Sequence, residues 1–402
     1  MTPISRKSFL KSSLLAAAGM GLTTTKHIAA DQKVAAEIKI TDVKPYVMQR
    51  AIFVKVETDA GINGWGEASH NNPKLSAEVI NSYLKKLVIG KSPFTTESFW
   101  TTMYFKEEDL GTSGLLPGTI AGIDNALWDL KGKILNLPVH KIMGSNGAER
   151  IRVYGSFKRG SGNNPKTPAQ MAREAAAFVS QGYKTVKARM QIRALNINPE
   201  PDPTYAIVKE IRNAIGDDIE LFVDFNNGYT AAKAIALTNK LYEHFNIAAV
   251  EEPVSYQDYN GLRQVVEAVD IPVMAGEHEF NKWQMRDLIT IGKADMINLD
   301  VNKGGGLTEA RKIAFMAEAF EKHIMVHNAR PTLATAASLQ LLSSISNAAR
   351  VQEYAGKREE LGLTPLFEDY FEFDNGYLRI PELPGLGLIV NEKAMEKNKL
   401  NK

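Results

Sequence analysis

Glu220-Leu-Phe-Val-Asp224 is a short apolar run that ends in an acidic residue, and Phe225-Asn-Asn-Gly228 follows it directly. The same arrangement recurs through the second half of the chain, where single acidic residues or a histidine stand just after other short apolar runs. Residue numbers differ by 27, 26, 23, 27 and 26 along the series Asp224, Glu251, Glu277, Asp300, His327 and Glu353. Each interval has the length of one strand plus one helix. Because the carboxyl ends of the strands in a parallel barrel meet at one mouth, these side chains are expected to converge there.

From about Ile151 the chain alternates between short apolar runs and longer helical stretches such as 168–181 and 203–215. This alternation predicts an α/β fold, a (β/α)8 barrel of the TIM type over residues 151–355. An open doubly wound sheet is the rival architecture, but it rarely takes functional residues from so many consecutive strands. The eight predicted strands are Val153–Ser156, Thr185–Ala188, Glu220–Val223, Ala248–Val250, Val273–Ala275, Met296–Leu299, Ile324–Val326 and Val351–Gln352.

The segments on either side of the barrel have a different pattern. Residues 37–69 alternate in the manner of strands, and helical periodicity follows at 77–89 and 118–135. A strand meander followed by helices predicts a separate α+β domain over residues 37–150. Beyond the barrel, residues 356–402 are rich in proline, glycine and aromatic residues, and we expect this segment to pack back on the N-terminal domain and complete it.

Residues 1–30 have the features of an export signal, with four basic residues and no acidic one. Ser5-Arg-Lys-Ser-Phe-Leu-Lys11 precedes Ser12–Leu22, a run of 11 apolar and small residues that is too short to span a bilayer but fits the core of a signal peptide. The motif resembles a twin-arginine export signal in which Lys7 replaces the second arginine; a Sec signal or a frayed tail is the alternative. We predict cleavage near Ala30 and an exported, periplasmic protein.

Charge and composition exclude several classes of function. The 402 residues include 48 basic and 46 acidic side chains, and removing the four basic residues of the signal leaves 44 against 46, a net charge of −2. A nearly neutral body offers no electrostatic footprint for nucleic acid. Outside the signal no segment has 18 uninterrupted apolar residues, so no membrane span is expected in the mature protein. The lack of cysteine excludes disulfides, thiolate metal ligands and a cysteine nucleophile.

Three of the recurring residues, Asp224, Glu251 and Glu277, are carboxylates expected on consecutive strand ends. Three anions at one mouth repel one another strongly unless a cation offsets their charge. Oxygen ligands without histidine or cysteine suit a hard divalent ion, so we predict one Mg2+ per site, with water and substrate in its other positions. Three ordinary solvated loop carboxylates would not explain why they fall in register on neighbouring strands.

The motifs around these carboxylates are similar to those of a known family. Three motifs resemble the metal-ligand motifs of the enolase superfamily, and within it those of the mandelate racemase/muconate lactonizing enzyme branch. They are Val223-Asp-Phe-Asn-Asn-Gly, Val250-Glu-Glu-Pro-Val and Met274-Ala-Gly-Glu. The stretches Val54–Glu67 and Ala121–Lys133 resemble that branch's capping-domain hairpin and the long helix that leads into its barrel. The resemblance covers about residues 38–390 and implies an N-terminal capping domain and chemistry like that of the acid-sugar dehydratases.

The resemblance also implies a role for each recurring residue. The Mg2+ ligands correspond to Asp224, Glu251 and Glu277. Asp300 and His327 correspond to a dyad in which the carboxylate holds the imidazole in one tautomer, suited to proton transfer near neutral pH. Glu353 corresponds to a carboxylate that contacts a substrate carboxylate oxygen opposite the metal.

The predicted second strand of the barrel departs from the family pattern. That branch typically has Lys-x-Lys there, with the second lysine as a base, whereas this chain has Lys187-Ala188-Arg189. Period-two alternation points Lys187 and Arg189 to the same side, so both can enter the mouth. Arginine stays protonated and is a poor base, so Arg189 is better suited to hold a carboxylate or stabilise an enolate. Lys187 could stabilise charge or, less readily, act as a base.

With His327 as the one clear base, the pattern favours elimination over racemisation, which needs acid/base groups on both faces of one carbon. We predict that His327 removes the proton α to the carboxylate of a sugar acid, that a β-hydroxyl leaves, and that the enol becomes a 2-keto-3-deoxy acid. The alternatives are an epimerase or racemase, a lactone cycloisomerase, and a non-catalytic sugar-acid binding protein. Candidate substrate contacts are His70, Asn226 and His278, although Asn226 and His278 could instead orient the metal ligands. Related barrels commonly assemble, so we expect a homo-oligomer.

Overall fold

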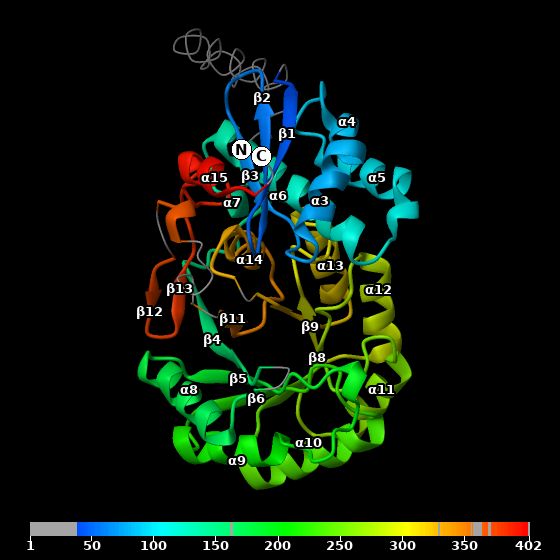
Figure 1. Cartoon of the computed structure of the whole chain (residues 1–402), viewed down its shortest axis with the longest axis vertical. Helices are drawn as coiled ribbons and strands as arrows, with labels where there is room; N and C mark the ends of the chain where they lie inside the picture. The colour runs from blue at the N-terminus through cyan, green and yellow to red at the C-terminus, as the bar shows by residue number, and fades with distance from the viewer. Residues whose placement is uncertain are drawn as a thin grey trace, which may run out of the picture.

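The computed structural model describes residues 38–160, 164–328, 330–354, 356, 364–368 and 371–400. The predicted export signal, residues 1–30, lies outside the described residues. Within the described ranges, no helix combines the length and the apolar character needed to cross a membrane. Figure 1 shows two bodies, a strand-and-helix barrel in the lower part of the view and a smaller domain of three strands and several helices above it.

The barrel consists of parallel strands in chain order, and from β4 to β10 each strand pairs with the next. β11 (Gln352–Glu353) pairs in parallel with β4 (Arg150–Lys158), and Ala348 forms a parallel bridge with Ile324 on β10, so the ring closes. This closure confirms the predicted (β/α)8 barrel and is incompatible with an open doubly wound sheet. The remaining strands are β5 (Thr185–Arg189), β6 (Glu220–Asp224), β7 (Ala249–Glu251), β8 (Val273–Ala275), β9 (Met296–Leu299) and β10 (His323–Val326).

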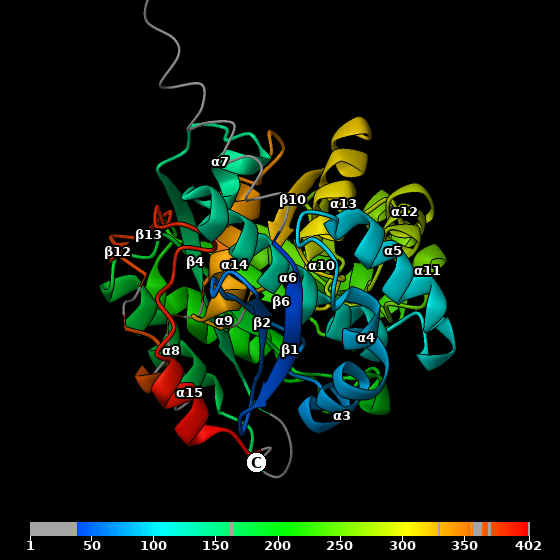
Figure 2. The same cartoon turned by 90° about the horizontal axis from the view of Figure 1, so that it is seen from above.

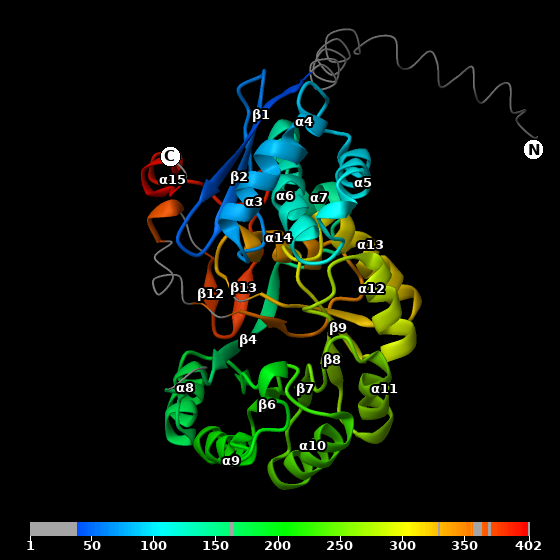
Figure 3. The ribbon, with the colours of Figure 1, turned by 45° about the vertical axis from the view of Figure 1, so that its right-hand side comes forward.

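Helices connect successive strands and cover the outside of the barrel (Figure 3). In α9 the buried residues Ile207, Ile211 and Ile215 recur every four positions, which gives the helix one apolar face toward the strands. α8 begins with a capping box, in which Thr167 and Gln170 exchange side-chain hydrogen bonds with each other's backbone N–H groups. The helices are α8 (Pro168–Ser180), η3 (Ala194–Asn196), α9 (Thr204–Ile215), α10 (Ala231–Phe245), α11 (Tyr259–Ala268), α12 (Lys282–Asp287), η4 (Leu288–Gly292), α13 (Leu307–Ala319) and α14 (Leu333–Leu342).

The N-terminal domain packs an antiparallel sheet, in the order β1-β2-β3, against the long helix α6 (Leu115–Leu135). A Cβ atom on Gly66 of β3 would lie 2.4 Å from the carbonyl oxygen of Gly122 in α6, so only glycine allows this close approach. α6 also contacts the first turn of α13, where Trp128 Nε1 donates to Thr308 Oγ1 at 2.8 Å. The other elements are β1 (Ile40–Val47), β2 (Ile52–Thr58), β3 (Gly64–Glu67), α3 (Pro73–Val79), η1 (Ile80–Leu84), α4 (Lys85–Val88), α5 (Thr96–Lys106), η2 (Glu108–Leu110) and α7 (Val139–Met143).

The C-terminal segment contacts both bodies. On the capping side, Glu392 in α15 (Glu392–Asn398) accepts hydrogen bonds from Lys55 Nζ at 2.9 Å and Trp65 Nε1 at 3.1 Å. Figure 2 shows α15 beside the N-terminal strands. On the barrel side, β13 pairs antiparallel with the first residues of β4. The remaining elements of this segment are η6 (Thr364–Leu366), β12 (Phe373–Asp374) and β13 (Tyr377–Arg379).

Three features of the fold differ from the sequence predictions. β4 begins at Arg150 rather than Val153, because β13 extends its pairing, and the β12–β13 hairpin was not predicted because strands of two and three residues are too short to show alternation. The helix predicted over residues 77–89 begins earlier, at Pro73, and a turn of π-helix interrupts it. Proline fits the first helical turn because its missing N–H has no intrahelical partner there.

Candidate active site

The recurring residues meet at the carboxyl ends of the barrel strands, on the side that faces the capping domain. Asp224 and Glu251 end β6 and β7 and are partners in the strand register, and Glu353 ends β11. The other three stand one or two residues beyond β8, β9 and β10. All six are at most 9% exposed: Asp224, Glu251, Glu277, Asp300, His327 and Glu353. The convergence expected from the spacing is therefore found in the structure.

Lys187 on β5 lies inside this ring and is fully buried. Its Nζ is 2.5 Å from Glu251 Oε2 and 3.3 Å from Glu353 Oε1. Burial disfavours the charged amine, but the two carboxylates outweigh it and raise the pKa of Lys187 well above its ordinary value. Burial of Glu353 favours its neutral form, but the charge of Lys187 outweighs this and helps to lower the pKa of Glu353 to about 2. In this arrangement Lys187 is protonated, which suits charge stabilisation.

Arg189 points to the same side of β5 as Lys187, as the alternation predicted. Its Nε donates to Asp224 Oδ2 at 3.2 Å. Burial alone would lower the pKa of Arg189, but the surrounding carboxylates outweigh burial and raise this pKa above its ordinary value. Asn226 also contacts Asp224, through its backbone N–H to Oδ1 at 2.7 Å and its side-chain amide to Oδ2 at 2.6 Å. Asn226 therefore orients a carboxylate in this structure, which is the second of the two roles considered for it.

His327 and Asp300 form a close pair. His327 Nδ1 is 2.7 Å from Asp300 Oδ2, and Asp300 Oδ1 accepts the backbone N–H groups of Asn302 at 2.8 Å and Lys303 at 2.9 Å. Burial raises the pKa of Asp300, but the hydrogen bond and charge of His327 outweigh it and lower the pKa below its usual value. An ionised Asp300 that accepts from Nδ1 leaves Nε2 of His327 available for proton transfer.

The second ring nitrogen of His327 faces Glu277. Nε2 lies 3.1 Å from Glu277 Oε2, within ion-pair distance, yet Oε2 is buried without an aligned hydrogen bond. Lys303 reaches the same loop and donates from Nζ to the carbonyl oxygen of Glu277 at 2.9 Å. His278, the next residue, stacks on Tyr256 with ring centroids 5.0 Å apart, and its Nδ1 lies 3.7 Å from Glu277 Oε1. His278 is thus placed as a neighbour of a carboxylate and lies outside the cavity that contains His327.

The charges and free oxygens at this mouth fit a divalent cation. Burial raises the pKa of Asp224 and raises that of Glu251 well above its usual value, so both resist ionisation without a further cation. Oε1 of Glu251 and Oε2 of Glu277 are buried without a hydrogen bond. Three cations, Lys187, Arg189 and Lys303, face six buried carboxylates, which would leave an excess of three negative charges if all six were ionised and every histidine neutral: Asp224, Glu251, Glu252, Glu277, Asp300 and Glu353.

The arrangement of these oxygens is not yet that of a metal site. Within the described ranges, no three or more His, Asp or Glu side chains are already clustered so that they could hold a metal ion. Asp224, Glu251 and Glu277 instead turn toward Arg189, Lys187 and His327 respectively. To share one divalent ion, the three carboxylates would have to rotate away from these cationic neighbours, whose attraction the ion would replace.

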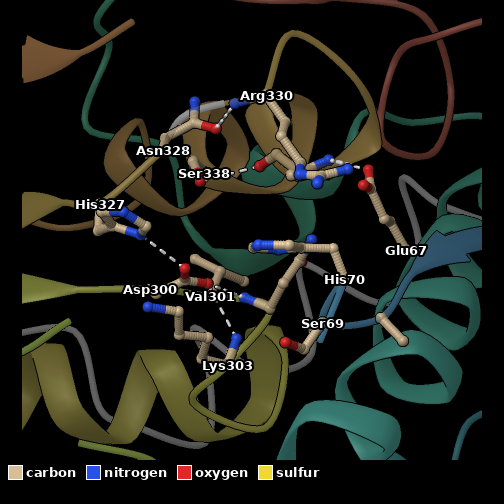
Figure 4. Close-up of a pocket in the computed structure, with 13 residues that line it drawn as sticks. Glu67, Ser69, His70, Asp300, Val301, Lys303, His327, Asn328, Arg330 and Ser338 are labelled. Carbon is tan, nitrogen blue, oxygen red and sulfur yellow. Dashed lines mark hydrogen bonds and ion pairs between the residues drawn. The ribbon is translucent and has the colours of Figure 1, made fainter. Parts of the chain in front are cut away.

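A cavity opens beside the dyad, between barrel and capping domain. Figure 4 shows His327 and Asp300 on one side of it and Glu67, His70 and Arg330 on the other. His70, which follows β3, is exposed toward the opening. Partial burial under the neighbouring side chains and the charge of Arg330 lower the pKa of His70 to about 4. His70 is thus placed where it can contact a molecule bound next to His327, as expected for a substrate contact.

Two side chains of this cavity were not predicted from the sequence. Glu67 is 1% exposed, and its Oε2 accepts from the hydroxyl of Thr332 and from the N–H of Ala334 at 3.1 Å. Arg330 lies three residues beyond His327 in the same loop. Glu67 ends the stretch that resembles the capping-domain hairpin, but nothing in the spacing brings that hairpin to the loop after the seventh strand, which contains Arg330.

Two family models match this chain over most of its length. A model for the N-terminal domain of mandelate racemase/muconate lactonizing enzymes matches residues 24–144, and a model for enolase C-terminal domain-like proteins matches residues 170–394. A relative, the D-galactonate dehydratase of Ralstonia pickettii (strain 12J), is 31% identical over 372 residues, which cover 90% of this chain and 95% of the relative.

Solved structures with similar folds include two that bear on the chemistry. The 3,6-anhydro-D-galactonate cycloisomerase from Zobellia galactanivorans superposes with a TM-score of 0.79 at 30% identity, over 90% of this chain and 99% of that one. A mandelate racemase/muconate lactonizing protein from Paracoccus denitrificans PD1222, solved in complex with magnesium, superposes with a TM-score of 0.82 at 27% identity, over 90% of this chain and 98% of that one.

Proposed function

The chain belongs to the mandelate racemase/muconate lactonizing enzyme branch of the enolase superfamily, and we propose that it is a Mg2+-dependent dehydratase of a sugar acid that forms a 2-keto-3-deoxy acid. One observation carries the proposal. The His327–Asp300 dyad, with Nδ1 and Oδ2 2.7 Å apart, presents Nε2 to the same mouth as a buried carboxylate cluster with excess negative charge. The relationship to D-galactonate dehydratase supports the class of substrate and reaction.

Asp224, Glu251 and Glu277 are the residues that would hold the Mg2+. The ion, when bound, would offset their repulsion and withdraw charge from a substrate carboxylate, which makes the adjacent C–H more acidic. The donor set is all oxygen, as Mg2+ prefers, and the relative solved with magnesium supports the choice of ion. Asn226 would keep Asp224 oriented through its two hydrogen bonds.

His327 performs the proton transfers in this proposal. Asp300 fixes the proton on Nδ1, so Nε2 accepts the proton from C2, α to the substrate carboxylate. The negative charge that develops on the carboxylate oxygens is stabilised by Lys187 and Arg189, whose raised pKa values keep both side chains protonated. Glu353 anchors Lys187 from the opposite side.

Elimination needs an acid for the leaving group as well as a base. The C2–H bond breaks, the C3–O bond breaks, and the hydroxide equivalent leaves as water with the proton that His327 Nε2 has taken from C2. The resulting enol then ketonises, taking a proton at C3. Because one imidazole can serve both steps, the site does not need the second acid/base face that racemisation requires, and Arg189 offers no such face.

A cycloisomerase is the second candidate. The relative from Zobellia galactanivorans, a 3,6-anhydro-D-galactonate cycloisomerase by name, is about as similar to this chain as the dehydratase relative. Opening an anhydro ring expels a β-oxygen after the same proton abstraction, so the residues proposed above would serve both reactions. The two differ in whether the expelled oxygen leaves as water or stays attached to the product.

The setting of the enzyme belongs to the same proposal. Residues 5–22 support export by a twin-arginine-like route and thus a periplasmic site of action. Fractionation of cells that express the full chain, with a Lys7→Ala change beside the unaltered signal, tests the export. Assembly into a homo-oligomer is proposed because related barrels commonly assemble, and light scattering of the purified protein tests it.

The reaction is tested by incubating the Mg2+-loaded protein with a library of sugar acids and following the products by NMR. A 2-keto-3-deoxy acid that has lost one water relative to its substrate supports dehydration, a ring-opened or ring-closed product of unchanged mass supports the cycloisomerase, and an epimer supports racemisation. If no acid reacts while one still binds, the chain is a binding protein and the proposal fails. Glu277→Gln serves as a matched variant that is expected to weaken Mg2+ binding itself, measured by calorimetry.

A further inference from the structure

One end of the cavity beside His327 has no part in the proposed proton transfers. It is formed by Glu67 and His70 from the capping domain and by Arg330 from the loop after β10, and the space between the lining side chains is about 400 Å3, including open solvent. Figure 4 shows these three side chains grouped away from His327 and Asp300. A substrate whose C2 meets His327 therefore extends its later carbon atoms toward this end or out of the site.

Arg330 brings to the cavity a cation without a direct ion pair, although its charge already acts on Glu67: burial raises the pKa of Glu67, and Arg330 offsets part of that rise. Its Nη1 donates to the carbonyl oxygen of Arg50, and among the described residues no carboxylate lies within the 4.0 Å of an ion pair with its guanidinium. The side chain is half-buried, so solvent does not fully replace a partner. A guanidinium carries five N–H donors, and most of those of Arg330 are free to meet a ligand.

Glu67 supplies the complementary acceptor. Its Oε2 is used by Thr332 and Ala334, which hold the start of α14, but its Oε1 is buried and has no hydrogen-bond partner. The residue is only 1% exposed and lines the same cavity as Arg330. A buried acceptor without a partner is costly, so a bound group that donates to Oε1 gains free energy on entering.

A donor and an acceptor that face one cavity discriminate between the two kinds of group found at the far end of sugar acids. A hydroxyl both accepts from a guanidinium and donates to a carboxylate, so it satisfies Arg330 and Glu67 together. A second carboxylate would accept from Arg330 but has no proton for Oε1 of Glu67, and its charge would be repelled there. The pair therefore favours an uncharged, hydroxylated end.

We propose that Arg330 and Glu67 select the substrate by its far end, so that the sugar acid is an aldonate with hydroxyls beyond C3 and not an aldarate with a second carboxylate. The inference rests on the proposed function, because it assumes that C2 of a sugar acid lies at His327. His70 lines the same end of the cavity.

The test compares a six-carbon aldonate, D-galactonate, with the corresponding dicarboxylate in the Mg2+-loaded wild type and in two variants. We expect kcat/KM to be at least ~10-fold higher for the aldonate. Arg330→Gln should raise KM for the aldonate by about 10-fold with little change in kcat, because it removes a charged donor remote from the reacting atoms. Glu67→Gln, which keeps an oxygen for Thr332 and Ala334, should narrow the preference for the aldonate over the dicarboxylate.

Three controls separate recognition from a general structural effect. Arg379→Gln removes an exposed arginine of β13, away from the cavity, and should change neither KM nor the preference. Arg330→Lys should restore part of the affinity, and the unfolding temperature of each variant shows whether it is folded. Equal or better turnover of the dicarboxylate by the wild type, or a fall in kcat without a change in KM in Arg330→Gln, overturns this inference alone. A wild type that forms a keto acid from no sugar acid overturns the proposed function instead.

Discussion

The two sides of the candidate site are built in different ways. On the barrel side, residues from successive strand ends hold one another in a dense, fully buried set of ion pairs, with Lys187 between Glu251 and Glu353 and Asp300 against His327. On the cap side, Arg330 has no carboxylate within ion-pair distance among the described residues, and Glu67 keeps a buried oxygen without a partner. The charged groups of the barrel side are therefore paired with one another, whereas the cap side keeps hydrogen-bonding groups that a ligand could satisfy.

This contrast separates chemistry from recognition. Groups that move a proton must keep a fixed protonation state and geometry, and strand ends tied by ion pairs provide both. Groups that recognise a substrate need unsatisfied donors and acceptors that only the ligand completes. We therefore expect changes on the barrel side to alter rate and stability, and changes on the cap side to alter affinity and preference.

The largest effect is expected from His327→Asn. Loss of the imidazole removes the group that both takes and returns the proton, so kcat should fall by about 10³-fold or more. The Mg2+ affinity should be retained or rise, since the three proposed ligands are untouched and Glu277 loses the neighbouring imidazole from which it would have to turn to bind the ion. Steady-state kinetics and calorimetry measure the two quantities on the same preparation. A variant that keeps more than a tenth of wild-type turnover would show that another group is the base.

A second large effect is expected from Lys187→Met. The change leaves Glu251 and Glu353 buried without their cation, so the free energy of unfolding should fall by about 3–5 kcal/mol in the presence of a chelator. Added Mg2+ should recover part of this loss, because it offsets the same charges. Urea unfolding with and without Mg2+ measures both the loss of unfolding free energy and its recovery. Lys293→Met, which breaks an exposed pair with Glu267, is the matched control and should cause no resolvable change.

The cap side should respond weakly to the same unfolding experiment. Arg330→Gln breaks no ion pair, so its free energy of unfolding should stay within about 1 kcal/mol of the wild type. A loss as large as that of Lys187→Met would mean that Arg330 is structural, and the division between the two sides would fail.

The smallest effect is expected in the pH profile of a His70 variant. A histidine whose folded pKa is lowered to about 4 is largely neutral one pH unit above that value, so the charge of His70 changes little between pH 5 and 9. His70→Gln should therefore leave the shape of kcat/KM against pH unchanged over this range, even if its magnitude falls. A shift in either limb would show that His70 carries the titration assigned here to the barrel side.

How much of the site could be predicted follows the same division. The regular interval between Asp224, Glu251, Glu277, Asp300, His327 and Glu353 predicted their convergence because a barrel converts sequence spacing into position around a ring. The side of the strand taken by Lys187 and Arg189 followed from alternation alone. Their partners did not, since which carboxylate Lys187 meets depends on side-chain conformations in a crowded, charged interior.

The cap side was largely hidden from the sequence. His70 was a candidate only through the resemblance to the family's capping domain, and neither Glu67 nor Arg330 was assigned a role. Gly66 lets β3 pack closely against α6, and the end of β3 then reaches the start of α14. No local sequence pattern encodes these tertiary contacts. The β12–β13 hairpin was missed for a similar reason, because β13 forms by pairing with the first residues of β4, which are far from it in sequence.

The central claim is that His327 takes a proton from C2 of a sugar acid and that a hydroxyl leaves from C3. The most direct measurement is NMR of the product formed from D-galactonate by the Mg2+-loaded protein in D2O. The account predicts a 2-keto-3-deoxy acid with one deuterium at C3, and no product with His327→Asn. Recovery of D-galactonate or its epimer with deuterium at C2, and no keto acid, would contradict it.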